Sequence, residues 1–306
     1  MATKKAVRKT STSSRTAAAK KTTSKKPAAK VAAAKTSKTT FVSKLPRLPE
    51  NIPNRILAEI VGTFILALVA LTTASMGALY VGLALVVIVL ALGAVSGAHV
   101  NPAVTFGLWV ARRINWLTGL VYWAAQFVGA MLAVAVANLV SSGYFTIGFG
   151  SLTAISWPLF AVEMVGALVF VFGLVAVWAR DELSVGAKAL GVGLSLAVGL
   201  FAAGSLLNFV QLSAYQAYQK ESANNTSETA VAFPRQLNVS SAVLNPAVAL
   251  AVTEDKSLES SITGSSNEDG PKNSRFGLEL VLGTLSGAAV GSWLYLLTNF
   301  RARKNR

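Results

Sequence analysis

The chain has no cysteine and a single histidine, and only 13% of its 306 residues are charged. The lack of cysteine excludes disulfide, thiolate and cysteine-metal chemistry. A lone histidine has no partner set for a metal site. No nucleophile–base arrangement is visible either, so we expect no catalytic residue, no metal and no cofactor. What is abundant is apolar: 53% of the residues are hydrophobic and the mean hydropathy is +0.54, a composition typical of membrane proteins.

The net charge of +15 is concentrated at the start of the chain. Residues 1–49 hold 14 Lys and Arg and no acid, so the remainder has 14 basic against 13 acidic groups, a balance of +1. Residues 1–50 have too few large apolar side chains to offset the entropy of ordering, which predicts a disordered basic cytoplasmic tail. Three interpretations of the tail stay open: a solvated segment that fixes membrane orientation, a contact with anionic lipid, or a contact with nucleic acid.

From Arg55 onward the chain is a series of apolar runs of about 20 residues, the length of a helix that crosses a bilayer. Two further runs are too short to cross and predict half-helices that enter and leave on one side, namely Val104–Val110 and Val248–Val252. Backbone of this kind is tolerated at membrane depth only inside protein or along a water-filled cavity, which indicates a pore or binding cavity. The runs predicted to be transmembrane helices are Ile56–Met76, Leu79–Val95, Trp116–Val140, Trp157–Trp178, Ala189–Phe209 and Phe276–Leu297.

Each short run is preceded by the same triplet, first as Asn101, Pro102 and Ala103 and again as Asn245, Pro246 and Ala247. Asparagine is a favoured N-cap because its side-chain oxygen accepts from the first turn. Proline suits the first helical position. The side-chain NH2 is then free to donate outside the helix. We therefore predict that both triplets lie at mid-membrane and point at one pore.

The chain also contains an internal repeat. The pattern Ala58-Glu59-x-x-Gly62 matches Val162-Glu163-x-x-Gly166, and each copy is followed by one further span and a triplet. Three spans plus a half-helix, repeated, must be inverted in the membrane, and such repeats place their functional site at the midplane. We expect a channel domain over residues 51–300, with repeat one at about 55–140 and repeat two at about 157–298.

The distribution of Lys and Arg predicts the orientation of the helices. The basic tail, the Arg112 and Arg113 pair, the Arg180–Lys188 connection and the short basic terminus at 301–306 fall on one side, which we expect to be cytoplasmic. The long polar loops 211–241 and 253–275 then lie outside. We therefore expect a multi-pass protein of the cell membrane with both termini in the cytoplasm.

These motifs resemble those of aquaporins and aquaglyceroporins, the major intrinsic protein family, from about Arg55 to Leu297. One Asn-Pro-Ala would be weak support, but two copies in an inverted repeat with a glutamate in each are specific. The resemblance implies an all-α membrane fold of six transmembrane helices plus two re-entrant half-helices, and a homotetramer with one pore per subunit. The residues that carry it are Ala58–Phe64, Ser96–Thr105, Gln126–Ala130, Glu163 and the second triplet.

The resemblance also implies roles for individual residues. Asn101 and Asn245 would donate to a passing oxygen while the positive ends of the half-helices repel cations, the established exclusion mechanism of this family. Glu59 and Glu163 would order backbone donors of the re-entrant loops, with a proton or ion site as the rival interpretation. His99 and Gln126 are assigned to the same structural support. For His99 the rival interpretation is gating by pH.

The sequence departs from the family at the outer constriction. The aligned positions are all apolar: Val81, Leu200, Ala242 and Val248. Most members have an arginine at the position of Val248, with histidine and aromatic partners for water or aromatic partners for glycerol. A narrow apolar ring tends to dewet and would slow water, whereas a wide one would admit larger solutes. One hypothesis is that Arg235 folds back from its loop to supply the missing guanidinium.

The sequence therefore predicts a passive channel for water or small neutral solutes, such as glycerol-like polyols, ammonia or gases, in a lipid bilayer. Two alternatives remain. The first is a non-conducting membrane scaffold or adhesion protein on the same fold, which the apolar constriction and long loops would suit. The second is a secondary transporter, which shares inverted repeats but requires ion ligands near the midplane.

Overall fold

The computed structural model describes residues 46–72, 77–141, 155–226, 229–264 and 274–299. These residues belong to one unit, Leu45–Arg306. The predictions for the tail up to residue 45 and for the terminus at 301–306 lie outside the described residues, as does most of the connection between residues 141 and 156.

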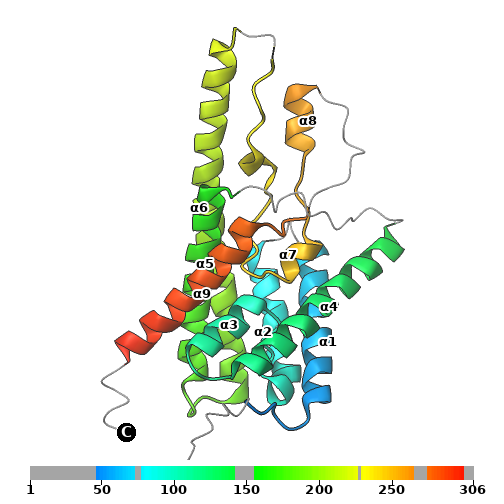
Figure 1. The fold of residues 1–306 in the computed structure, drawn as a ribbon, viewed down its shortest axis with the longest axis vertical. Coiled ribbons are helices and arrows are strands. Elements are labelled where there is room, and N and C mark those ends of the chain that lie inside the picture. The colour runs from blue at the N-terminus through cyan, green and yellow to red at the C-terminus, as the bar shows by residue number, and fades with distance from the viewer. Residues whose placement is uncertain (1–45, 73–76, 142–154, 227–228, 265–273, 300–306) are drawn as a thin grey trace, which may run out of the picture. The chain divides into compact units, whose positions relative to one another are not determined.

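Six helices of the described chain are long and apolar enough to cross a membrane (Figure 1). No strand occurs among the described residues beyond an isolated bridge between Thr253 and Ser274. The predicted all-α membrane fold with six spanning helices is confirmed. The helices are α1 (Ile52–Thr72), α2 (Ala78–Ser96), α4 (Trp116–Val140), α5 (Trp157–Trp178), α6 (Val185–Asn224) and α9 (Leu278–Thr298).

Helix α6 differs most from its prediction because it runs for 40 residues, to Asn224. The segment 211–241, predicted to be a polar loop, therefore begins as a continuation of this helix. Hydropathy marks where the apolar stretch ends, near Phe209, and polar helix formers such as Gln, Lys and Glu continue the helix beyond it. The extension packs against the chain that follows it, with the rings of Tyr218 and Phe233 edge to face at 5.3 Å.

The described connections between the long helices contain four short helices. Helix α3 (Pro102–Val110) and helix α7 (Val248–Ala251) follow the two triplets. Helix α7 has four residues, one fewer than the predicted run, because Val252 is already extended. The other two, η2 (Arg235–Asn238) and α8 (Ser257–Thr263), lie within the two long polar segments.

The long helices pack in two matching sets (Figure 1). Helix α1 packs against α2 and α4, and helix α5 packs in the same way against α6 and α9. Helices α2 and α6 join the sets, where Gly82 and Gly193 face each other so closely that a Cβ on Gly82 would lie 2.7 Å from the Gly193 carbonyl oxygen. The short helices cross between sets, since α3 packs against α9 and α7 packs against α4 and α1. This pairing is the one that an internal repeat requires.

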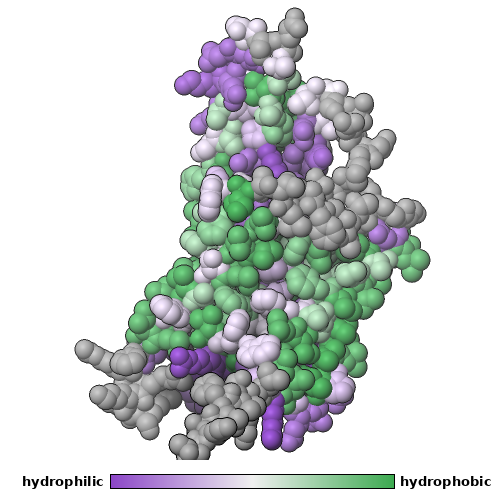
Figure 2. Space-filling model, viewed as in Figure 1, coloured by the Kyte–Doolittle hydropathy of each residue, from purple (hydrophilic) through white to green (hydrophobic). Residues whose placement is uncertain are grey.

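The surface agrees with a membrane location. Figure 2 shows hydrophobic residues covering the long helices, whereas hydrophilic residues gather over the far turns of α6 and at the opposite end. Large apolar side chains stay exposed along the spans, such as Val87 at 63% and Leu139 at 85%. Surfaces of this kind are stable against lipid tails and unfavourable in water.

Candidate functional site

The two triplets start their helices through their asparagine side chains. Asn101 Oδ1 accepts from the N–H of Ala103 at 2.7 Å, with the backbone of Asn101 extended at φ −159° as an N-cap requires. Asn245 Oδ1 accepts from the N–H groups of Ala247 at 3.0 Å and Val248 at 3.3 Å. Each triplet therefore closes the first turn of its own helix.

The same two asparagines also join the helices to each other. Asn101 Nδ2 donates to the carbonyl oxygen of Leu244 at 2.9 Å, and Asn245 Nδ2 donates to that of Val100 at 3.0 Å. Each carbonyl belongs to the residue that precedes the opposite asparagine. The two re-entrant segments are thus held end to end by reciprocal hydrogen bonds, and each amide keeps a second N–H.

The carbonyls that accept these bonds belong to residues in an unfavourable backbone conformation. Val100 has φ +45° and Leu244 has φ +56°. The left-handed region is costly for side chains of this size, above all for a β-branched valine. Both residues press against a glycine of a spanning helix: a Cβ on Gly62 would lie 2.5 Å from Val100 Cγ1, and one on Gly166 would lie 2.5 Å from Leu244 Cδ2. The glycines of the repeated motif therefore make room for the two strained residues.

Glu59 holds the first strained segment from behind. Its carboxylate is fully buried and accepts from the N–H groups of His99 at 3.0 Å and Val100 at 2.8 Å. The Ser96 hydroxyl at 2.6 Å and the Gln126 amide at 2.8 Å also donate to it. Such a carboxylate has its lone pairs occupied by fixed donors. Glu59 and Gln126 thus lie together behind the first re-entrant segment, with Glu59 bound to its backbone N–H groups.

His99 connects this support to the cavity. Its Nδ1 lies 3.2 Å from the Thr105 hydroxyl, to which the Gln126 amide also donates at 2.9 Å. Its ring meets the Tyr122 ring edge to face at 4.9 Å. His99 is buried, and the cavity is lined in part by this residue. His99 is therefore both packed and hydrogen-bonded within its loop.

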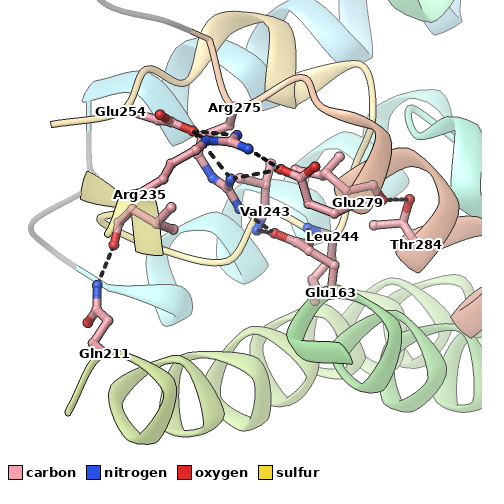
Figure 3. A network of polar contacts seen from close by, with 11 residues as sticks. Glu163, Gln211, Arg235, Val243, Leu244, Glu254, Arg275, Glu279 and Thr284 are labelled. Carbon is pink, nitrogen blue, oxygen red and sulfur yellow. Dashed lines mark hydrogen bonds and ion pairs between the residues drawn. The ribbon is translucent and has the colours of Figure 1, made fainter. Parts of the chain in front are cut away.

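Glu163 binds the backbone of the second strained segment as Glu59 binds the first, but with a different side-chain partner (Figure 3). It accepts from the N–H groups of Leu244 at 2.9 Å and Val243 at 3.2 Å. Where neutral side chains complete the shell of Glu59, the guanidinium of Arg275 donates to Glu163 at 3.2 Å. Arg275 is 1% exposed, and its backbone N–H donates to the carbonyl of Val252 at 2.8 Å.

Arg275 belongs to a larger charged cluster, which we define as Glu163, Glu254, Glu279, Arg235 and Arg275 (Figure 3). Arg235 bridges Glu254 at 2.6 Å and Glu279 at 3.0 Å, and Arg275 lies 3.8 Å and 4.0 Å from the same two carboxylates. The three glutamates are buried. The sequence did not predict this cluster, because its members come from separate segments of the chain. The spacing of four residues between Arg275 and Glu279 was the available signal, although Arg275 itself precedes α9.

The hypothesis that Arg235 replaces the missing filter arginine is wrong. Burial of Arg235 acts to lower its pKa, but the hydrogen bonds and charges of Glu254 and Glu279 raise the pKa above its ordinary value. The guanidinium is therefore held as a cation between two carboxylates. Arg235 is not among the described residues that line the cavity. Arg235 is part of the charged cluster instead.

A cavity of about 350 Å³ lies above the paired asparagines. Its walls come from α1, α2, α6 and the segment that leads into α7. Its described lining includes both triplet asparagines and all four aligned constriction positions, which we call the apolar ring. These residues are Asn101, Asn245, Val81, Leu200, Ala242 and Val248, and the lining also holds the polar residues His99, Ser205, Asn208, Ser240 and Ser241.

Three of the four constriction positions are almost fully buried. Val248 exposes 2% of its surface, Ala242 6% and Leu200 8%, although all three line the cavity. No Asp, Glu, Lys or Arg is among the described lining residues. One cavity therefore combines neutral polar side chains, the apolar ring and a pair of amide donors.

Comparison with known proteins gives consistent matches. A family model described as Major intrinsic protein matches residues 51–211. Aquaporin NIP2-3 of Zea mays is 33% identical over 169 residues, which are 51% of this chain and 56% of that protein. Probable aquaporin TIP3-2 of Oryza sativa subsp. japonica is 56% identical over 54 residues, 18% of this chain and 20% of that protein. The chain thus spans about half, or less, of the length of the curated relatives that it matches.

Among solved structures, the aquaglyceroporin from Plasmodium falciparum aligns with a TM-score of 0.48 and 20% identity. The alignment covers 79% of this chain and 95% of that one.

We predict that Arg275→Met lowers the free energy of unfolding by about 3–5 kcal/mol, because it leaves the buried Glu163 carboxylate without its cation. The double variant Glu163→Gln with Arg275→Met should recover most of the loss, since a glutamine oxygen still accepts from Val243 and Leu244. The measurement is denaturant-induced unfolding in detergent, followed by far-ultraviolet circular dichroism. A double variant no more stable than Arg275→Met alone would show that Arg275 does not act by compensating Glu163.

Proposed function

The chain belongs to the major intrinsic protein family, and from this premise we propose that it is a passive channel for water or small neutral solutes. A multi-pass membrane protein that acts as a channel and not as an enzyme is what the family implies. The observation that supports the proposal most directly is the single cavity that brings both triplet asparagines together with all four aligned constriction positions.

Ion exclusion would follow from the lining of this cavity. The N-terminal end of α3 carries a positive partial charge, and each triplet asparagine offers one remaining N–H donor. No carboxylate among the described lining residues offsets this potential. Helix α7 adds only a single turn, so more of the barrier comes from the first half-helix. A neutral solute can accept from the amides, whereas a cation at the same point would meet two N–H donors and the positive end of α3.

Selectivity among neutral solutes would come from the apolar ring. Narrow apolar constrictions tend to dewet. A solute whose dehydration costs little free energy therefore has the lowest barrier to crossing such a ring. This places ammonia and small gases above water, and water above polyols. The ring supplies no hydroxyl or guanidinium to replace the water that a polyol would shed.

The rival functions receive less support. A secondary transporter needs ion ligands in the cavity, but Glu59 and Glu163 bind backbone donors behind it, and neither is among its described lining residues. Among the described residues, no group of three or more His, Cys, Asp and Glu side chains is placed to hold a metal ion. A non-conducting scaffold would need no open cavity at the triplets. We keep it as the alternative that the transport experiment distinguishes.

We extend the proposal to topology and assembly. The side that carries Arg112, Arg113 and Arg180 is taken as cytoplasmic by the positive-inside rule, which places the α6 extension and α8 outside. The protein is proposed to lie in the cell membrane with both termini in the cytoplasm, as a homotetramer with one pore per subunit. The tail is proposed to contact anionic lipid, with nucleic acid as the less favoured partner.

We predict that proteoliposomes containing the protein take up ammonia faster than empty vesicles, and that Val248→Trp returns the rate to that of empty vesicles by filling the ring. The measurement is a stopped-flow record of internal pH after an ammonium jump, repeated with osmotic gradients for water and glycerol. Leu132→Trp is the matched control, because Leu132 is 47% exposed on the surface of α4 and does not line the cavity. If none of the solutes crosses faster than in empty vesicles, the scaffold alternative is favoured.

A second prediction concerns the ring itself. Val248→Thr keeps the volume of the side chain and adds a hydroxyl, so water should wet the constriction more readily. We expect the ratio of water to ammonia permeability to rise severalfold. Val87→Thr is the control, since Val87 is 63% exposed and outside the cavity. An unchanged ratio would show that the apolar ring does not set selectivity.

A further inference from the structure

A basic pocket lies at the end of the molecule opposite to the α6 extension. It has a volume of about 570 Å³ and is formed where the start of α1, the turn after α3 and the start of α4 come together. We define the basic pocket by the polar residues that line it: Arg55, Arg112, Arg113, Asn115 and Thr118. The rest of its wall is mostly uncharged, and no carboxylate is among its described lining residues.

Within the described residues, the positive charges of this pocket form no ion pair. The Arg55 guanidinium donates to the backbone carbonyl of Glu50 at 3.3 Å and to the Tyr122 hydroxyl at 3.4 Å, both of them neutral groups. For Arg112 and Arg113, the described part of the chain offers no ion pair. Three guanidiniums around one concavity repel one another unless an anion is bound among them.

The turn that presents these arginines is well defined. Arg112 donates its backbone N–H to the carbonyl of Trp109 at 2.9 Å, and Arg113 donates to that of Leu108 at 2.8 Å. Arg112 has φ +57°, at a helix end where glycine is the favoured residue. The turn therefore carries a large cationic side chain at the position where a glycine would be less strained.

An apolar groove of about 290 Å³ adjoins the basic pocket on the surface of α3 and α4. Trp109 lines both, so the two lie next to each other on either side of this residue. The groove is otherwise formed mainly by Phe106, Trp116, Leu120 and Trp123. Trp109 is 43% exposed, Trp116 40% and Leu120 51%, and the Trp123 Nε1–H is already satisfied by the carbonyl of Pro102 at 3.0 Å. The groove thus presents aromatic faces and a leucine to the bilayer.

We propose that the basic pocket and the apolar groove together form a binding site for one anionic phospholipid, with the phosphate among the arginines and an acyl chain along the groove. Guanidinium forks match phosphate oxygens in geometry and charge. Asn115 and Thr118 bond to each other, and Asn115 donates to the carbonyl of Arg47, so they shape the pocket and leave the phosphate to the arginines. A free phosphate would use only the basic pocket. A zwitterionic lipid would leave the excess positive charge uncompensated. The tryptophans mark the level of the membrane interface, where a headgroup lies.

The site also contacts the support of the first re-entrant segment. Tyr122, which accepts from Arg55, donates its hydroxyl proton to the carbonyl of Ser96 at 2.8 Å, and Ser96 in turn donates to Glu59. A lipid bound at Arg55 therefore stabilises the folded arrangement of this segment. Anything that binds the folded state but not the unfolded state raises the temperature of unfolding.

The test uses the full chain in detergent and measures the midpoint of thermal unfolding while phosphatidylglycerol is added. Matched titrations use phosphatidylcholine, inorganic phosphate and glycerol phosphate. Phosphatidylglycerol should raise the midpoint, and the other three should leave it nearly unchanged. If inorganic phosphate or glycerol phosphate gives the same rise, the site belongs to a soluble anion and the proposal fails.

Variants separate this site from the basic tail. The variant Arg112→Gln with Arg113→Gln should bind phosphatidylglycerol more weakly. The mole fraction of phosphatidylglycerol that gives half of the full rise in the unfolding midpoint should increase by about tenfold or more, because each cation near an anionic lipid raises the affinity severalfold. Leu120→Ser should weaken the lipid effect through the groove alone. The charge-matched control is Arg180→Gln with Lys188→Gln, on the same predicted side, and should respond like the unaltered chain. Equal responses in all four proteins would assign the effect to the tail and overturn the proposal.

Discussion

Two hydrogen bonds from asparagine side chains, Asn101 to the carbonyl of Leu244 and Asn245 to that of Val100, join the two re-entrant segments end to end. The backbone there is strained and buried, so a lost hydrogen bond would leave a costly unpaired polar group. The carbonyls are fixed by the opposite asparagine and the N–H groups by a buried glutamate. This arrangement fixes the two half-helices end to end, so that they neither slide past each other nor separate. The cavity lined by the asparagines depends on that fixed position.

The two halves of this support differ in their electrostatics. Glu59 is completed by neutral donors, whereas Glu163 is completed by Arg275 and its charged cluster. A buried ion pair is seldom a source of net stability, yet the loss of one partner is costly. The second half is therefore fixed by charges that depend on one another. These guanidiniums lie behind the cavity wall, and the described wall itself is uncharged, which leaves the apolar ring as the feature that would set selectivity.

Sequence analysis could predict the parts of the structure that follow local rules. The spans α4 and α5 were found at both ends because hydropathy and helix length agree there, and the triplets were placed as helix starts from capping chemistry alone. The α6 extension was not predicted, because hydropathy marks only where the apolar stretch ends. The polar helix formers beyond it continue the helix, and contacts such as Tyr218 with Phe233 hold it against the chain that follows. The charged cluster joins residues more than one hundred positions apart, and Arg235 was misassigned because its two glutamate partners were not visible as neighbours.

The central claim is that Asn101 and Asn245 act as one reciprocal joint. A double-mutant cycle of unfolding free energies in detergent tests it most directly, with Asn101→Ala, Asn245→Ala and the variant that combines both. Each single change also removes an N-cap, but those local costs add independently and cancel in the cycle. If the joint exists, either change opens it, so the combined variant should lose about 0.5–3 kcal/mol less than the sum of the single losses. Losses that add to within about 0.5 kcal/mol would contradict the account.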